Sequence, residues 1–116
     1  MYKPSRLLSS FRIAGFQYHD GALVLSKLKV GKKLDLVLEF DNPHDPDAVA
    51  IYRKGVHLGY VPRGKIDWIA LMMRFGHGDA FECRIVQIDP EAEPWNQVRV
   101  GIYVVDARAK SQRKGE

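Results

Sequence analysis

The stretch DNPHDPD, residues 41–47, lies between two runs with strand-like composition, Leu34 to Phe40 and Ala48 to Arg53. Its two prolines fix their own φ angles and favour extended backbone at Asn42 and Asp45, which precede them. Asn and Asp side chains also bond nearby backbone groups, which suits a tight turn. The stretch therefore predicts an ordered loop that fixes how two antiparallel strands meet.

The same loop is crowded with hydrogen-bond acceptors, because it holds three aspartates and one asparagine in seven residues. Mutual repulsion makes that crowding unfavourable unless donors reach the loop from elsewhere. Two interpretations follow. The loop is a rigid connection between strands, or it is a preformed acceptor site for hydroxyl or amide donors of a ligand.

Alternating apolar residues outside the loop indicate a chain rich in short strands. Leu34, Leu36, Leu38 and Phe40 alternate with mostly polar residues, which predicts a half-buried strand. Further strands are expected at 10–18, 47–53, 56–61, 81–88 and 95–105, with a hairpin-like break at residues 54–55. We expect a short helix over 22–28 and a longer one over 64–75. The fold class is therefore mainly β with inserted helices (α+β), a small, partly open β-barrel of OB-like or SH3-like kind.

The longer helix has an apolar stripe that favours core packing over a cofactor-binding role. One face carries apolar residues at helical spacing, and others widen it: Ile66, Ile69, Ala70 and Met73, then Trp68, Leu71, Met72 and Phe75. Gly76 is well placed to end the helix as its C-terminal cap.

Length and charge indicate one domain with basic ends. The chain has 116 residues, 46% of them hydrophobic, and a net charge of +4. We expect a flexible segment at 1–9, a domain at 10–106 and a disordered basic tail at 107–116. Residues 1–12 and 108–116 each carry a net charge of +3, which leaves −2 for the body between them. A nucleic-acid site in the body therefore needs local basic residues rather than a global field.

Cysteine content and hydropathy favour a cytoplasmic location. Cys83 is the single cysteine, so no internal disulfide framework can form, and it is expected to be a buried small hydrophobe. The longest apolar run is too short to cross a bilayer, and no secretory signal pattern opens the chain.

The chemistry-bearing residues do not form a recognisable catalytic or metal site. The four histidines and Cys83 lack the spacing of zinc ligands. The acidic loop lacks the glycine and the distal glutamate of a calcium loop. No serine sits in a nucleophile elbow, and no glycine-rich phosphate loop is present. The sequence therefore predicts a binding domain with no enzyme activity, no cofactor and no metal.

Three segments, taken in order and spacing, resemble the HIRAN domain family: GFQYHDG at 15–21, DNPHDPDAVAIY at 41–52 and LGYVPR at 58–63. The resemblance covers about residues 8–106. It implies an OB-like β-barrel with inserted helices. Single-domain bacterial members exist. Other members stand at the front of eukaryotic helicase-like enzymes that act on stalled replication forks, where the domain grips the 3′-hydroxyl end of single-stranded DNA.

The resemblance implies roles for individual side chains. Tyr18 takes the place of an aromatic residue on which the terminal base stacks. Asn42 and Asp45 match the positions that hold the terminal nucleotide, with Asp45 taking the 3′-hydroxyl. Arg63 sits at a basic position that contacts phosphate.

Three positions depart from the eukaryotic pattern. Gln17 stands where an arginine lies near phosphate, so the interaction with that phosphate is absent or weakened. His44 replaces a tyrosine, and Tyr60 replaces a histidine. Independently of the family, aromatic rings offer stacking faces, and Lys65 near the start of the longer helix can meet phosphate. On the residues alone, Tyr18 and Tyr60 fit equally well as half-buried barrel residues with satisfied hydroxyls.

These features together predict a single-stranded DNA-binding module that recognises a 3′-hydroxyl end, in DNA repair or stalled-fork processing. Expected partners are single-stranded DNA and a helicase or nuclease, with nucleoid association if the protein is bacterial. The alternative is a protein-interaction module that uses the same barrel groove. The acidic body favours the alternative, whereas aromatic residues beside Arg63 favour DNA. A small metal-dependent hydrolase is the third and weakest hypothesis.

Overall fold

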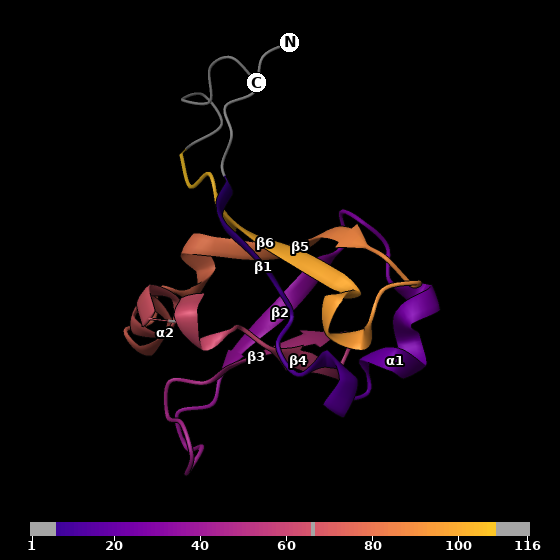
Figure 1. Cartoon of the computed structure of the whole chain (residues 1–116). Helices are drawn as coiled ribbons and strands as arrows, with labels where there is room; N and C mark the ends of the chain where they lie inside the picture. Colours follow the sequence, from indigo (N-terminus) through magenta and orange to yellow (C-terminus); the bar gives the residue numbers. More distant parts are fainter. Residues whose placement is uncertain (1–6, 66, 109–116) are drawn as a thin grey trace.

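A computed structural model describes residues 7–65 and 67–108 as a six-stranded antiparallel sheet curled into a half-barrel (Figure 1). The strands are β1 Leu7–Arg12, β2 Lys33–Leu38, β3 Val49–Arg53, β4 Val56–Tyr60, β5 Phe81–Ile88 and β6 Val98–Val104. The helices are α1 Gly21–Val24 and α2 Asp67–Arg74. Single 3-10 turns are η1 Phe16–Tyr18, η2 Leu25–Lys27, η3 Arg63–Lys65, η4 Gly78–Ala80 and η5 Pro94–Asn96. The mainly β, partly open barrel predicted from sequence is confirmed.

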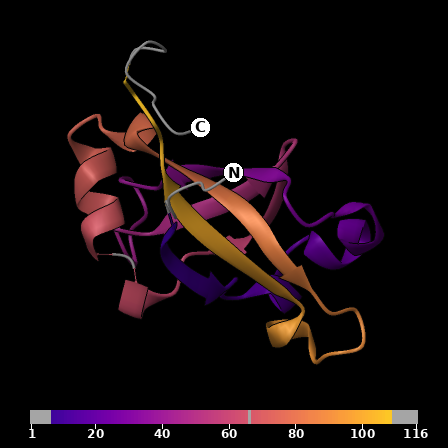
Figure 2. The ribbon, with the colours of Figure 1, turned by 90° about the horizontal axis from the view of Figure 1, so that it is seen from above.

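The strands lie in the order β1-β6-β5-β2-β3-β4, and β2 joins the two halves of the sheet. Its first residues, Lys33 and Leu34, pair with β5, whereas Asp35 to Leu38 pair with β3. One strand thus changes partner along its length, which lets the sheet fold over on itself. Helices α1 and α2 lie at opposite ends of the molecule (Figure 2).

The two edges of this sheet meet at a single bridge just after β1. Ala14 and Tyr60, the last residue of β4, exchange two backbone hydrogen bonds of 2.9 Å. The bridge is possible because the residue before Tyr60 is a glycine. A Cβ on Gly59 would lie 2.5 Å from the Ala14 carbonyl oxygen, and its φ of +152° also favours glycine.

The core is one cluster of apolar side chains enclosed by the curled sheet. It includes members of every strand together with residues of η1 and α2: Phe11, Ile13, Phe16, Leu28, Leu34, Val49, Ile51, Leu58, Val61, Ile69, Ala70, Phe81, Cys83, Ile85, Val98, Val100 and Ile102. In β3 the simple alternation of inside and outside fails, because Val49, Ala50 and Ile51 are all buried. Burial raises the pKa of the Cys83 thiol to about 12, which fits the expected role as a small hydrophobe.

Two turn predictions are confirmed. Lys54 and Gly55 both have positive φ, as the tight turn between β3 and β4 requires. Gly76 ends α2 with a φ of +86°. Its N–H donates to the Met73 carbonyl, and the next N–H, of His77, donates to the Met72 carbonyl. That pair of bonds is the Schellman arrangement.

The N-terminal boundary differs from the sequence prediction. The first strand begins at Leu7 rather than Ser10 and ends at Arg12, and Phe16 to Tyr18 form a 3-10 turn instead of continuing it. Residues 7–9 are thus part of the sheet, because they align with β6. The rest of the expected flexible segment, 1–6, and residues 109–116 of the expected tail lie outside the described residues.

Several apolar residues predicted to face the core are exposed. Strand β2 ends at Leu38, and the chain turns where the Asn42 N–H bonds the Glu39 carbonyl, so Phe40 leaves the alternating face and is 70% exposed. On α2 the core-facing stripe is narrower than predicted, because Leu71 and Phe75 are exposed while Ile69 and Ala70 are buried. None of the described helices has the length and apolar character needed to cross a bilayer.

Gly59→Ala should lower the free energy of unfolding by at least about 2 kcal/mol, since a methyl group there meets the Ala14 backbone and the backbone conformation is unfavourable for alanine. Gly64→Ala is the control, because a methyl group added there would meet nothing within 4 Å beyond its chain neighbours, and it should change stability by less than about 0.5 kcal/mol. Urea unfolding of both variants measures the difference. Equal stability of the two would show that the bridge does not need close approach.

Candidate functional site

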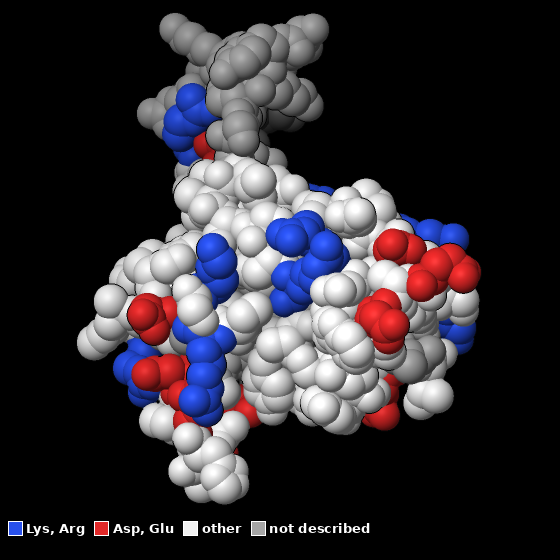
Figure 3. All heavy atoms as spheres, in the orientation of Figure 1, with Lys and Arg blue, Asp and Glu red and all other residues white. Residues whose placement is uncertain are grey.

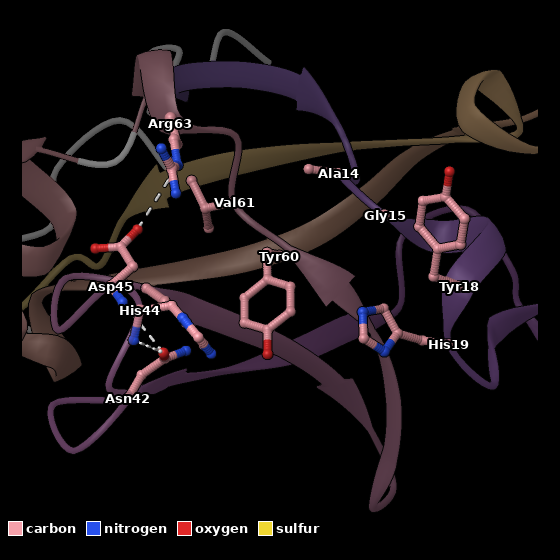
Figure 4. A pocket seen from close by; sticks show the side chains of 11 residues that line it. Ala14, Gly15, Tyr18, His19, Asn42, His44, Asp45, Tyr60, Val61 and Arg63 are labelled. Carbon is pink, nitrogen blue, oxygen red and sulfur yellow. Dashed lines mark hydrogen bonds and ion pairs between the residues drawn. The ribbon is translucent and has the colours of Figure 1, made fainter.

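A pocket of about 660 Å³ opens beside the bridge, between η1, the acidic loop and the end of β4 (Figure 4). Its volume lies in the range of small-ligand sites. The lining combines aromatic rings, hydrogen-bonding groups and a few small residues: Ala14, Gly15, Tyr18, His19, Asn42, His44, Asp45, Ala48, Tyr60, Val61 and Arg63.

The acidic loop satisfies its own backbone through side-chain acceptors. The Asn42 Oδ1 atom accepts from the N–H of His44 at 2.8 Å and of Asp45 at 3.1 Å. The Asp45 Oδ1 atom accepts from the N–H of Asp47 at 3.0 Å. These are the local bonds that Asn and Asp form in ordered turns. The loop is therefore a rigid connection between the strands, as one of the two interpretations predicted. The second oxygen of Asp45 takes no part in these loop bonds.

The far end of the loop is held by α2. One guanidinium nitrogen of Arg74 donates to the Asp47 Oδ1 atom at 2.6 Å and to the Pro46 carbonyl at 2.9 Å. Asp47 thus receives a donor from outside the loop, as its crowded acceptors require. The loop is fixed relative to a helix that itself packs on the core.

Glu39 holds the near end of the loop and the back of the pocket together. Its Oε1 atom accepts from the Asn42 side-chain amide and from the Tyr60 hydroxyl, both at 3.0 Å. Burial raises the pKa of Tyr60, and its hydrogen bond to Glu39 raises it further. The Tyr60 hydroxyl therefore stays protonated and remains a donor over the whole physiological range.

A cluster of aromatic rings supports Tyr60 from behind. His19 stacks obliquely on His57 with 4.1 Å between ring centroids, and His57 stacks on Tyr52 at 4.8 Å. Tyr60 meets both imidazoles edge-on. Burial, followed by the neighbouring His57, lowers the pKa of His19 below the usual 6.5. His19 is therefore uncharged at neutral pH and offers an apolar face to the pocket.

The two candidate stacking tyrosines have opposite environments. Tyr18 is 80% exposed and stands at one rim of the pocket. Tyr60 is half-buried and its hydroxyl is hydrogen-bonded, as expected for a barrel residue rather than a fully exposed stacking ring. Tyr18 is thus free to meet a ligand with its whole ring, whereas Tyr60 offers only part of its surface between the loop and His19 (Figure 4).

Arg63 approaches the loop from η3 on the opposite rim. Its Nε atom lies 3.9 Å from the second oxygen of Asp45, with the Arg63 side chain 85% exposed. An ion pair that long and that exposed contributes little to stability. Both groups can therefore leave this contact and bind a ligand with little loss of free energy.

The structure brings together six of the eight side chains predicted from sequence: Tyr18, Asn42, His44, Asp45, Tyr60 and Arg63. Lys65 lies in η3 with Arg63 and is exposed, but it does not line the pocket. Gln17 does not line it either. Its Oε1 atom is buried without a hydrogen-bond partner among the described residues. The position where the resemblance implies a phosphate-contacting arginine thus holds an uncharged side chain outside the pocket lining.

Sequence reasoning missed Glu39, His19 and the small residues of the pocket wall. Ala14 and Gly15 carry no side-chain chemistry, and only the pairing of Ala14 with Tyr60 shows that they form a wall. Glu39 reads as an ordinary polar residue in an alternating strand. A weak signal for His19 existed, since it belongs to the GFQYHDG segment flanked by two glycines.

The described residues contain no group of three or more His, Cys, Asp or Glu side chains that could hold a metal ion. What the pocket offers is stacking surface, hydrogen-bond acceptors and one guanidinium. Those groups can bind and orient a ligand that has a flat ring, a hydroxyl and a negative charge.

A curled six-stranded sheet with this pocket at its seam defines a small β-barrel binding domain. The HIRAN domain profile matches residues 7–105, and the chain belongs to the HIRAN domain family.

Two solved structures share the fold. A protein from Lactobacillus plantarum, known from a crystal structure, superposes with a TM-score of 0.70 at 21% identity, over 87% of this chain and 95% of that one. The HIRAN domain of human HLTF superposes with a TM-score of 0.56 at 16% identity, over 88% of this chain and 81% of that one. No curated protein matches this sequence.

Glu39→Gln should lower the pKa of Tyr60 toward 10, because it removes the nearby charge while keeping an acceptor for the hydroxyl. Glu39→Ala should also lower the free energy of unfolding by about 1–3 kcal/mol, since two donors lose their partner. Ultraviolet titration of the phenolate, read as the difference from the Tyr60→Phe variant, measures the pKa. Asp35→Asn, an equal charge change at an exposed site on β2, is the control and should leave the titration unaltered. An unchanged Tyr60 titration in Glu39→Gln would contradict the assigned hydrogen bond.

Proposed function

We propose that this domain binds the 3′-hydroxyl end of single-stranded DNA in the pocket beside the bridge. The observation that carries the proposal is the placement of an exposed aromatic ring, Tyr18, and an incompletely paired carboxylate oxygen, on Asp45, in one pocket with an exposed arginine. These three groups match the base, the terminal hydroxyl and the phosphate of one nucleotide.

Stacking on Tyr18 explains a preference for single strands. A base that stacks on a side chain must leave its own stack, which an unpaired terminal base does most easily. Base–aromatic stacking contributes roughly 1–3 kcal/mol per base and tolerates any sequence. The domain would thus recognise the 3′ end of a strand whatever its base sequence.

Asp45 attracts a 3′-hydroxyl and repels a 3′-phosphate. One of its oxygens holds the loop through the Asp47 N–H, which fixes the orientation of the carboxylate. The other faces Arg63 at 3.9 Å and can accept a charge-assisted hydrogen bond from a 3′-hydroxyl. A 3′-phosphate would meet the same negative oxygen and be repelled, which turns one residue into a source of specificity.

Arg63 then serves a phosphate of the bound strand. It is exposed, on the opposite rim from Tyr18, and its contact with Asp45 is long. His44, exposed beside Asn42, adds a second ring for the terminal nucleotide. We extend the proposal to a role in DNA repair or in processing of stalled replication forks, where free 3′ ends occur, together with a helicase or nuclease partner.

Tyr18→Ala should weaken binding of a single-stranded oligonucleotide by about 1–3 kcal/mol, because stacking is removed, with little effect on stability because the side chain is exposed. Tyr18→Phe should bind as well as the wild type, since stacking needs the ring and not the hydroxyl. Fluorescence anisotropy titration measures both. Phe75→Ala, which removes a similarly exposed ring outside the pocket, is the control. Unchanged affinity in Tyr18→Ala would remove Tyr18 from the site.

Asp45→Asn should reduce the preference for a 3′-hydroxyl over a 3′-phosphate, because the repelling charge is removed while one oxygen can still accept from the Asp47 N–H. It should also bind hydroxyl ends somewhat less well, since the charge-assisted bond is gone. Competition between the two kinds of end on one oligonucleotide sequence measures the preference.

Asp41→Asn is the matched control, because it makes the same charge change at an exposed position of the same loop that does not line the pocket. If the wild type shows no preference for hydroxyl ends, or if Asp45→Asn retains it in full, the Asp45 mechanism is wrong. Binding of peptides in place of oligonucleotides would favour the protein-interaction alternative.

A further inference from the structure

The outer face of the β1–β6 pair carries two arginines that the proposed pocket does not use. Arg12 on β1 and Arg99 on β6 are register partners, so they lie directly opposite each other. Their neighbours Phe11, Val98 and Val100 are buried, which places both arginines on the outer side of the sheet. In Figure 3 basic side chains gather over these strands at the centre of the face.

This pair of like charges has no acidic partner among the ion pairs of the described residues. Arg12 donates to the Asn96 carbonyl at 3.0 Å, and Arg99 donates to the Ser10 hydroxyl at 3.2 Å. These neutral acceptors orient the side chains without cancelling their charge. Like charges directly opposite on neighbouring strands destabilise a sheet, and a bound anion would relieve that repulsion.

The position of Arg12 connects this face to the pocket. Residues two apart on an extended chain point to the same side, and Ala14, two residues beyond Arg12, lines the pocket. The Asn96 carbonyl that receives the Arg12 guanidinium belongs to η5, which lies next to η1, the turn that carries Tyr18. Arg12 thus lies two residues from the pocket wall, and it bonds a turn that contacts the turn carrying Tyr18.

We infer that Arg12 and Arg99 form a second phosphate-binding site, which holds the DNA backbone preceding the terminal nucleotide. The inference rests on the proposed function, because it takes the strand whose 3′ end occupies the pocket as its ligand. A strand that leaves the pocket past Tyr18 runs onto the β1–β6 face, so its phosphates meet two oriented guanidinium groups. This face adds local basic residues to the one that Arg63 supplies at the pocket.

The test compares the wild type with Arg12→Gln/Arg99→Gln on two ligands, an oligonucleotide of about eight nucleotides and a dinucleotide, both with free 3′-hydroxyls. The double variant should bind the longer ligand about tenfold more weakly. The slope of log affinity against log salt should be shallower by about 0.7 for each phosphate that the variant no longer neutralises. Dinucleotide affinity and the preference for hydroxyl over phosphate ends should stay as in the wild type, since the pocket is untouched.

The matched control is Lys27→Gln/Lys29→Gln, an equal charge change at two exposed positions that do not line the pocket. If the arginine variant equals this control in affinity and salt slope, the second site is wrong while the pocket stands. If the wild type itself lacks a preference for 3′-hydroxyl ends, the proposed function fails instead.

Arg12→Gln also removes the hydrogen bond to Asn96, which can loosen the β5–β6 connection, so two further variants separate charge from structure. Arg99→Gln alone removes only a bond to a serine hydroxyl and should still flatten the salt slope by about 0.7. Arg12→Lys/Arg99→Lys keeps both charges and should restore a salt slope close to that of the wild type. The inference would be overturned if Arg99→Gln kept the wild-type salt slope, or if Arg12→Lys/Arg99→Lys failed to recover that slope.

Discussion

The backbone bridge between Ala14 and Tyr60 is the constraint on which the pocket depends. It joins the two edges of a sheet whose strands are otherwise paired in one continuous order, and it forms only because Gly59 allows the chains to approach closely. Unpaired sheet edges expose backbone groups that need partners. The bridge satisfies two pairs of such groups and places η1, which carries Tyr18, opposite the loop that carries Asp45. The site is therefore a product of barrel closure, and its two walls come from distant parts of the chain.

The acidic loop owes its shape to tethers at both ends. Glu39 accepts a hydrogen bond from the Asn42 amide at one end, and Arg74 donates one to Asp47 at the other. Between them the loop bonds its own backbone, so the carboxylates of Asp45 and Asp47 are held in place without a ligand. Preorganised groups bind with a smaller decrease in conformational freedom. The interpretation as a rigid connection and the interpretation as an acceptor site are thus compatible, since rigidity is what makes the acceptors useful.

Charge is distributed unevenly around the pocket. Burial and His57 keep His19 neutral, and Glu39 and Asp45 place negative charge at the back and one side of the pocket. Arg63 on one rim, and Arg12 and Arg99 beyond the other, carry the positive charge. Under the proposed function, this distribution of charge would favour a strand whose terminal group is an uncharged hydroxyl and whose backbone phosphates lie outside the pocket. Recognition of an end and general affinity for the backbone would then depend on different residues.

The sequence by itself determined the elements and the loop. Strand β2 was predictable from its alternating leucines, strand β5 from its apolar run, and the end of α2 from the glycine that follows it, because these features act through local propensity. The family and six of the pocket side chains were also predicted. Tertiary structure decided what depends on contacts between distant residues. Phe40 continues an apolar pattern but is exposed because the chain turns after Leu38. Tyr18 and Tyr60 look alike in sequence, yet Glu39 holds the hydroxyl of Tyr60 while the Tyr18 ring stays exposed. Ala14 lines the pocket only because its backbone pairs with Tyr60 where the sheet closes. Its side chain carries no functional group, so its sequence gives no sign of this position.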